Sequence, residues 1–432
     1  MTETLVFSMR AMGAVVDIVA REGISPRFLA ALEDSWADCI PSPAASTDSA
    51  ESSADVRIYV VPQDASIQEE PEDGAFLRVG PESEWPFAAQ DFTSLVTIEL
   101  IKKFIVKLHL FHAAALMRPE TGETLALIGP SGRGKTTASR ALASSGWTYL
   151  SDETCAIDPE TLMVKPYPKP LSVIEHQGSP KAQLAASSLG LRTPTDADSP
   201  VPTLSRLIIL DRLEGEGDEP VGLFPVTLLQ GLQCLAEQSS GLAQTPHALR
   251  ELARLVDRVG GISKVRYRDS SELPDILASV SDAIPEPHDE TWEYLASQGS
   301  RDAETHVLSQ DVRPASTQAL ADYCRISRSP QASGLLTNEG LLIMHADRTV
   351  LYTPLGADLW LLTEGGATVG ELRSRLEQIY GPPPEGAFEL ALDAVLEDGA
   401  LIVSSSPASA EEPSALPSPA DEAAAGSRDL SS

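Results

Sequence analysis

The chain has 432 residues, of which 42% are hydrophobic, and a formal net charge of −31 at pH 7. This length allows two or three domains, and the apolar content is that of a globular protein. A surface so acidic repels nucleic acids and anionic membranes, so we expect neither as a partner. It suits a basic peptide partner, although simple solubility is the more common reason for such a charge.

Cysteine usage and the absence of a targeting segment predict a cytoplasmic protein. The four cysteines are far apart and form no CxxC pair, which argues against a zinc site or a disulfide framework. The first residues, "MTETLVFSMRAMG", lack the basic start and apolar core of a signal peptide. The longest apolar run, "FIVKLHLFHAAALM", is interrupted by Lys107 and His109 and is too short to span a bilayer.

In chain order, the first part of the sequence predicts an N-terminal α+β region. A helical pattern, "RFLAALEDSWADCI", and an apolar strand, "VRIYVVP", flank a loop of small, polar and acidic residues at 41–55. From about 93 to 285, apolar runs alternate with helical stretches, which is the α/β pattern. We therefore expect one α/β domain over 1–285, with its core at 93–285.

The stretch "GPSGRGKT", from Gly129 to Thr136, matches the G-x-x-x-x-G-K-[ST] pattern of a phosphate-binding loop, or P-loop. An apolar strand, "ETLALIG", precedes it and a helix, "KTTASRALASSG", follows it, as such a loop requires. Glycines let backbone N–H groups converge on phosphates, Lys135 can reach the β and γ oxygens, and the Thr136 hydroxyl can bind Mg²⁺. The predicted ATP-binding residues are Gly129, Pro130, Ser131, Gly132, Arg133, Gly134, Lys135, Thr136 and Thr137.

Carboxylates follow two of the predicted strands. "WTYLSDETCAID" carries Asp152 and Glu153, and a parallel strand there would bring them near the phosphates, as Mg²⁺ ligands or as a base for the attacking hydroxyl. The alternative is that Ser151 and Asp152 only form a turn. Asp211 ends the strand "RLIILD" and suits either a magnesium ligand or a surface ion pair, and both interpretations stay open.

His112, in "LFHAAAL", lies at the predicted entry to the core. A single histidine beside alanines is more often a packed core residue than a catalytic one, so the residue type alone does not assign it a role.

Taken together, these segments resemble the HPr kinase family, which shares its core with ATP-dependent phosphoenolpyruvate carboxykinases. The matching stretches are "HAAAL", "LIGPSGRGKTT", "LSDETCAID" and, more weakly, "PYPKPLSV", within roughly residues 100–275. The resemblance implies a phosphate-side role for His112, a base at Asp152, and a contribution of the acidic pair Asp152 and Glu153 to Mg²⁺ binding.

The chain departs from true HPr kinases at two motif positions. Thr137 stands where they have an acidic residue, and Glu153 stands where they have Asp. Their glycine-rich segment that docks the protein substrate is also not found. The chain therefore looks more like HPr-kinase-related enzymes encoded among peptide natural-product genes, some of which phosphorylate a serine of a ribosomally made peptide.

The C-terminal part of the sequence predicts a small separate module. Residues 286–332 are rich in acids, Ser and Pro and are expected to be a linker, and 404–432 are expected to be a disordered tail. Residues 333–403 predict a hairpin, three helices and a closing strand, in which Thr368 and Glu371 make a capping box.

This winged-helix-like segment suggests DNA binding, but it holds 11 acidic residues against three arginines, a net charge of −8. DNA binding needs the opposite sign. The segment instead resembles PqqD-like peptide-recognition modules, from "TVLYTPLGADLW" to "VLEDGALIV". The resemblance implies that a leader peptide adds a strand to the hairpin edge. A helical stability domain without a partner is the alternative.

The sequence thus predicts an α/β P-loop kinase core with an N-terminal α+β region and a PqqD-like domain. The expected reaction is ATP- and Mg²⁺-dependent phosphorylation of a peptide hydroxyl, with Asp152, Lys135, His112 and Glu153 as catalytic residues and Thr136, Asp152 and Glu153 at the metal. The alternatives are a kinase for a small metabolite such as serine, and a non-catalytic ATP-binding protein that delivers a peptide. The acceptor, the role of Asp211 and assembly into a homo-oligomer stay open.

Overall fold

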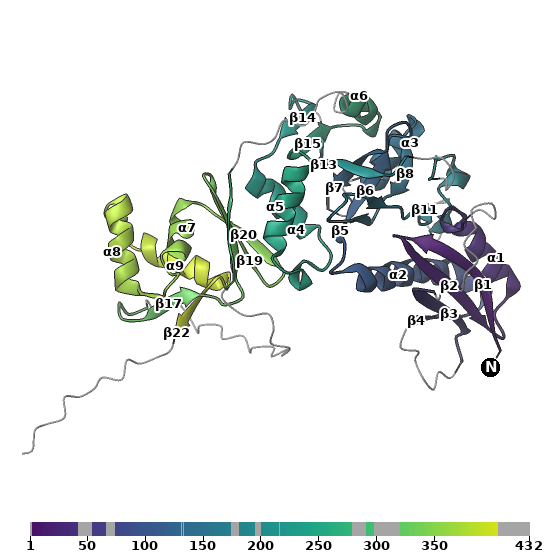
Figure 1. Cartoon of the computed structure of the whole chain (residues 1–432), viewed down its shortest axis with the longest axis horizontal. Helices are drawn as coiled ribbons and strands as arrows, with labels where there is room; N and C mark the ends of the chain where they lie inside the picture. The colour runs from purple at the N-terminus through teal and green to yellow at the C-terminus, as the bar shows by residue number, and fades with distance from the viewer. Residues whose placement is uncertain are drawn as a thin grey trace, which may run out of the picture.

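The computed structural model describes residues 2–41, 54–65, 74–130, 132, 134–173, 181–194, 200–215, 217–278, 291–297 and 320–404. The fold is mixed α/β, with an N-terminal sheet at one end, a central sheet with helices on both faces, and a C-terminal sheet with its own helices at the other end (Figure 1). The predicted tail falls outside these residues from 405 onward.

The N-terminal part is a four-stranded sheet covered by two helices. Its elements are β1 (Glu3–Ala11), β2 (Ala14–Arg21), α1 (Pro26–Ser35), β3 (Val56–Pro62), β4 (Gly74–Val79) and α2 (Trp85–Phe104). β1 and β2 form an antiparallel hairpin, whose turn residues Met12 and Gly13 both have positive φ, as a type I′ turn requires. β3 and β4 extend the sheet in parallel to β2. Phe28, Trp36 and Phe92 fill the core between the sheet and the helices, and the predicted helix and strand of this region are both present.

The central part is a six-stranded sheet in the order β14-β15-β13-β7-β6-β8. The strands are β6 (Ala113–Met117), β7 (Glu123–Ile128), β8 (Thr148–Ser151), β13 (Thr203–Arg212), β14 (Gly222–Pro225) and β15 (Ile262–Tyr267). β7, β13 and β15 are parallel, whereas β6 runs antiparallel to both β7 and β8. β8 therefore points the same way as β7 but is not its direct neighbour, because β6 lies between them.

Helices cover both faces of this sheet. They are α3 (Lys135–Ser144), α4 (Leu228–Glu237), α5 (Ala248–Arg258) and α6 (Leu273–Ala278). Alternate strand residues face opposite sides, so Leu127 and Ile208 pack against α3 and α6, and Ile128 and Ile209 pack against α4 and α5. The result is a three-layer core whose phosphate loop emerges at one edge of the sheet.

Two small sheets connect the core to the N-terminal part. They comprise β5 (His109–Phe111), β9 (Cys155–Ile157) and β10 (Val164–Lys165), and the pair β11 (Leu171–Val173) and β12 (Ala182–Leu184). Between β10 and β11, Tyr167 is fully buried against Trp36 of the N-terminal part and shares a hydrogen bond of 2.8 Å with Thr97 of α2. These contacts fix the loop that carries Lys169.

The C-terminal part contains the predicted hairpin, three helices and closing strand. Its elements are β16 (Glu293–Leu295), β17 (Arg325–Arg328), β18 (Ser333–Thr337), β19 (Gly340–His345), β20 (Arg348–Tyr352), α7 (Pro354–Leu361), β21 (Ala367–Thr368), α8 (Val369–Tyr380), α9 (Ala387–Glu397) and β22 (Leu401–Ser404). The capping box at the start of α8 is formed, since Thr368 accepts from the Glu371 backbone and Glu371 accepts from the Thr368 backbone.

The prediction that 286–332 is a linker is wrong at two places, where the structure has the strands β16 and β17. β16 pairs with β18 in the sheet of order β16-β18-β19-β20, and β17 pairs with β21 and β22 in a second sheet. Both strands find their partners far along the chain, which the polar composition of the segment concealed. The rest of the segment, apart from 291–297 and 320–332, lies outside the described residues.

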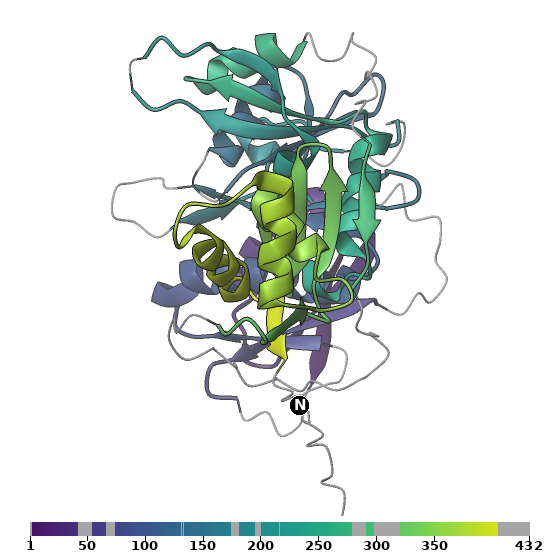
Figure 2. The same ribbon diagram turned by 90° about the vertical axis from the view of Figure 1, so that its left-hand side faces the viewer.

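The C-terminal sheet is buried on both of its faces. On one face, Leu335, Leu342 and Met344 belong to the same apolar cluster as Leu229 and Leu232 of α4. On the other face, β18 to β20 pack against α7, α8 and α9. Figure 1 shows this sheet between the two sets of helices, and Figure 2, turned by 90°, shows α8 and α9 in front of it. The predicted module therefore shares a core with the P-loop domain.

Candidate functional site

The predicted phosphate loop occupies the turn between β7 and α3. β7 ends at Ile128, and α3 begins at Lys135. Gly132 and Gly134 have φ of 81° and 87°, a left-handed conformation that favours glycine, both at the fixed motif position 134 and at the variable position 132. The N-terminus of α3 opens toward the loop, where its free N–H groups favour an anion. Ser131 and Arg133 lie outside the described residues.

Lys135 folds back over the loop. Its Nζ donates to the carbonyl oxygens of Gly129, at 2.6 Å, and Pro130, at 3.2 Å. Burial lowers the pKa of Lys135, against the opposing charges of Asp152 and Glu153. The ammonium is thus held at the loop, where a phosphate can replace the carbonyls as its partner.

Asp152 lies beside the start of α3. It follows directly on β8, and the Thr136 hydroxyl donates to its Oδ2 at 2.9 Å. Asp152 therefore lies near the loop, as expected. However, the strand that precedes it, β8, is not the direct neighbour of β7, because β6 lies between them. Ser151 also makes the turn that was the alternative, because its hydroxyl accepts from the backbones of Glu153 and Thr154. The turn and the approach of Asp152 to the loop coexist.

The arrangement fits a magnesium ion. Asp152 is only 7% exposed, its Oδ2 accepts from the Thr136 hydroxyl, and its Oδ1 has the Lys169 ammonium 3.7 Å away. A buried carboxylate beside a threonine hydroxyl offers oxygen ligands, and Mg²⁺ commonly takes one or two carboxylates together with substrate phosphates. Thr136 and Asp152 are the two residues that would hold it.

His112 lies between β5 and β6, and its backbone N–H donates to Gln238, just after α4, at 2.7 Å. Burial lowers the pKa of its imidazole, as does the charge of Lys135, while Glu153 and Asp152 act in the opposite direction. The structure thus brings His112 within the electrostatic reach of the P-loop lysine and the acidic pair, as a neutral imidazole near pH 7.

Lys169 is the residue of this site to which the sequence assigned no role. Its Nζ lies 2.8 Å from Oε2 of Glu153 and 3.7 Å from Oδ1 of Asp152, and the residue is 6% exposed. Burial opposes its charge, but the two carboxylates prevail and raise the pKa of Lys169. The only sequence signal was its place in "PYPKPLSV", between two prolines.

Asp211 forms an ion pair and does not approach Thr136 or Asp152 by any contact that the structure records. Its Oδ2 accepts from Arg266 of the neighbouring β15 at 3.0 Å, and the Arg266 guanidinium stacks over Phe224 of β14. Of the two interpretations that the sequence left open, the ion pair is the one that is observed.

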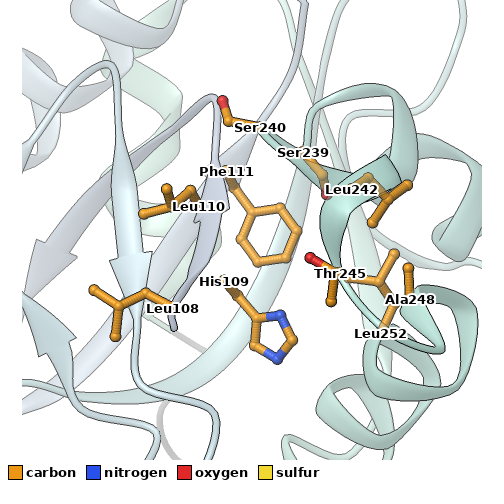
Figure 3. A pocket seen from close by; sticks show the side chains of 10 residues that line it. All are labelled: Leu108, His109, Leu110, Phe111, Ser239, Ser240, Leu242, Thr245, Ala248 and Leu252. Carbon is orange, nitrogen blue, oxygen red and sulfur yellow. The ribbon is translucent and has the colours of Figure 1, made fainter. Parts of the chain in front are cut away.

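A small cavity outside this site lies between β5 and the segment from α4 to α5 (Figure 3). His109 and Phe111 line one side, and Leu242, Thr245 and Leu252 line the other. Its volume is about 10 Å³, which is room for one water molecule at most. A nucleotide does not fit there.

No family model matches this chain. No curated protein matches it significantly either. The functional argument therefore rests on the residues and their geometry.

The chain's longest described helix is α2, with 20 residues, and none of the described helices combines the length and apolarity needed to cross a membrane.

Proposed function

We propose that the chain is an ATP- and Mg²⁺-dependent kinase that phosphorylates a hydroxyl group, that of a serine in a peptide. The observation that carries this proposal is the 2.9 Å hydrogen bond between Thr136 at the phosphate loop and Asp152 at the end of β8. It joins the position where phosphates would bind to a carboxylate that can act on metal or acceptor. The resemblance to HPr-kinase-related enzymes points in the same direction.

The residues of the site have separate tasks in such a reaction. ATP with its Mg²⁺ would supply the phosphoryl group and neutralise its charge. The loop N–H groups and Lys135 would bind and orient the phosphates, because they converge where α3 begins. Asp152 would orient the acceptor hydroxyl or accept its proton, and a neutral His112 beside it would contribute a hydrogen bond without adding charge.

The C-terminal sheet offers an edge for a peptide. Among the described strands, β20 pairs only with β19, so no described strand pairs with its other backbone edge. An extended peptide can add to such an edge through main-chain hydrogen bonds. The net charge of −8 over 333–403 favours a basic segment in that peptide. The same edge would also suit a non-catalytic delivery protein, which is the second candidate function.

The test measures binding and transfer separately. Isothermal titration with Mg·ATP should give one nucleotide per chain, and the Lys135→Ala variant should lose that binding or the transfer step. Radiolabelled ATP is then incubated with the protein and either free serine or a library of serine-containing peptides with basic flanks. Label on peptides supports the proposal, and label on serine alone supports the metabolite kinase. Binding of ATP without transfer to any acceptor supports the delivery protein.

A further inference from the structure

The ammonium of Lys169 lies between the two carboxylates of the candidate site. Its Nζ is 2.8 Å from Glu153 Oε2 and 3.7 Å from Asp152 Oδ1. The Thr136 hydroxyl donates to the other carboxylate oxygen of Asp152, Oδ2. A buried ammonium beside two adjacent carboxylates supplies the positive charge that a second metal ion would otherwise have to supply there.

Lys169 cannot easily leave this position. Pro168 and Pro170 restrict the backbone on both sides, and Lys169 N–H donates to the Tyr167 carbonyl at 2.8 Å. Tyr167 is in turn fixed by its N–H bond to Leu150 of β8, at 2.9 Å, and by its buried hydroxyl on Thr97. The loop that carries the lysine is thus anchored to the strand that carries the acids.

The other described ionisable groups of the site do not supply the positive charge that Lys169 supplies to the two carboxylates. Lys135 donates to the carbonyls of its own loop, and burial keeps His112 neutral near pH 7. Tyr149 and Tyr167 are buried and stay protonated. Among the described residues, Lys169 is therefore the cation that forms ion pairs with Asp152 and Glu153.

We propose that Lys169 is a positioning residue that serves as the second cation of this site, so that the protein binds one divalent ion with ATP, at Thr136 and Asp152. This inference rests on the proposed function. It also changes the role predicted for Glu153, whose carboxylate is engaged by Lys169 and is not a metal ligand. A second divalent ion at the pair would have to approach a fixed, buried ammonium of like charge.

The test counts Mn²⁺ ions bound to the full-length protein in the presence of a non-hydrolysable ATP analogue, by electron paramagnetic resonance. We expect one bound Mn²⁺ per chain in the wild type and in Lys169→Arg, which keeps the charge. Lys169→Met removes the cation that faces Glu153 and should therefore bind a second Mn²⁺ per chain at Mn²⁺ concentrations at which the wild type binds one. Lys181→Met, at an exposed lysine, is the matched control and should behave as the wild type.

Two Mn²⁺ ions in the wild type, or a single ion in a folded Lys169→Met variant, would overturn the inference. The first result leaves the proposed kinase function standing, because ATP and metal still bind. If the wild type binds neither the nucleotide nor Mn²⁺, the proposed function fails and the inference with it. If Lys169→Met does not fold, the counts for the wild type and Lys169→Arg decide alone.

Discussion

The hydroxyl of Thr136 lies 2.9 Å from the carboxylate of Asp152, although the two residues belong to different elements. Thr136 is in the first turn of α3, and Asp152 follows β8, the strand that α3 leads to. The bond is made because β7 and β8 point the same way and end at the same edge of the sheet. Either residue alone is an ordinary polar side chain, and together they make a candidate metal and acceptor site.

Asp152→Asn should weaken Mg·ATP binding, because Asp152 would hold the metal, and should also collapse the transfer rate at saturating Mg·ATP if Asp152 acts on the acceptor, because the amide cannot accept its proton. Single-turnover kinetics with a bound acceptor measure the transfer rate. Unchanged Mg·ATP affinity in the titration would remove Asp152 from the metal and leave it the acceptor role. Glu153→Gln is the paired control, and the milder defect is expected there, since Glu153 is engaged by Lys169.

Lys135→Ala should reduce phosphoryl transfer by about 10²-fold or more, because it removes a cation from the transferred group. The fold should survive, since the Lys135 side chain bonds only two loop carbonyls in the absence of nucleotide. Circular dichroism and the thermal midpoint check folding, and ADP formation checks activity. Lys102→Ala, at an exposed lysine of α2, should leave both unchanged. Normal turnover in Lys135→Ala would remove the loop from the mechanism.

The P-loop core and the C-terminal sheet should unfold together. Their apolar side chains form one cluster, so separating them would expose Leu229 and Leu232 on one part and Leu342 on the other. Calorimetry should give one transition for both parts, and Leu342→Ala should lower the free energy of unfolding of the whole by about 2–5 kcal/mol. Two independent transitions, with only one shifted by the mutation, would contradict the shared core.

The ion pair of Lys169 and Glu153 should make stability depend on pH in a defined way. Burial opposes ionisation of Glu153, but the charge of Lys169 prevails and lowers the pKa of Glu153 below the usual 4.5. The stabilisation that ionised Glu153 contributes is therefore present above pH 4.5 and is lost as pH falls through the lowered pKa. The raised pKa of Lys169 acts in the other direction. Its stabilisation is present below pH 10.5 and lost as pH rises further.

Glu153→Gln should therefore cost stability between about pH 4.5 and 10.5, and the cost should shrink as pH falls below 4.5. The expected loss is about 1–2 kcal/mol, less than for a fully buried pair because the Glu153 side chain is 45% exposed. Urea titrations at pH 3, 7 and 9 measure it. An equal loss at all three values would mean that packing, and not charge, is the contribution of Glu153.

Addition of a peptide to the edge of β20 that no described strand pairs with should be visible in amide hydrogen exchange. Peptides that the protein phosphorylates should slow exchange in residues 348–352 and not in β16, the opposite edge strand, because only the paired edge loses contact with water. Uniform protection of both edges would indicate general stabilisation. No protection at β20 in the presence of a phosphorylated peptide would exclude this edge as the docking site.

The sequence alone determined the features that depend on neighbours along the chain. The strand, glycine loop and helix around Lys135 lie within one continuous stretch, and so do the β19–β20 hairpin and the capping box of Thr368 and Glu371. Hydrophobic periodicity and the backbone needs of glycine report on such local structure directly. The position of Asp152 after a strand was also readable, although its strand pairs with β6 and not with β7.

Only the tertiary structure decided which distant segments meet. Lys169 reaches Asp152 and Glu153 because Tyr167 is bonded to Leu150, and Asp211 meets Arg266 because β13 and β15 are parallel neighbours. β16 and β17 form strands because they pair with β18 and β22, which lie further along the chain. The C-terminal sheet packs against α4 through apolar side chains whose partner the sequence does not indicate. The spacing of apolar residues along a sequence indicates whether a segment forms a helix or a strand. It does not show which other segment that element packs against, because this depends on which surfaces bury each other in the folded chain.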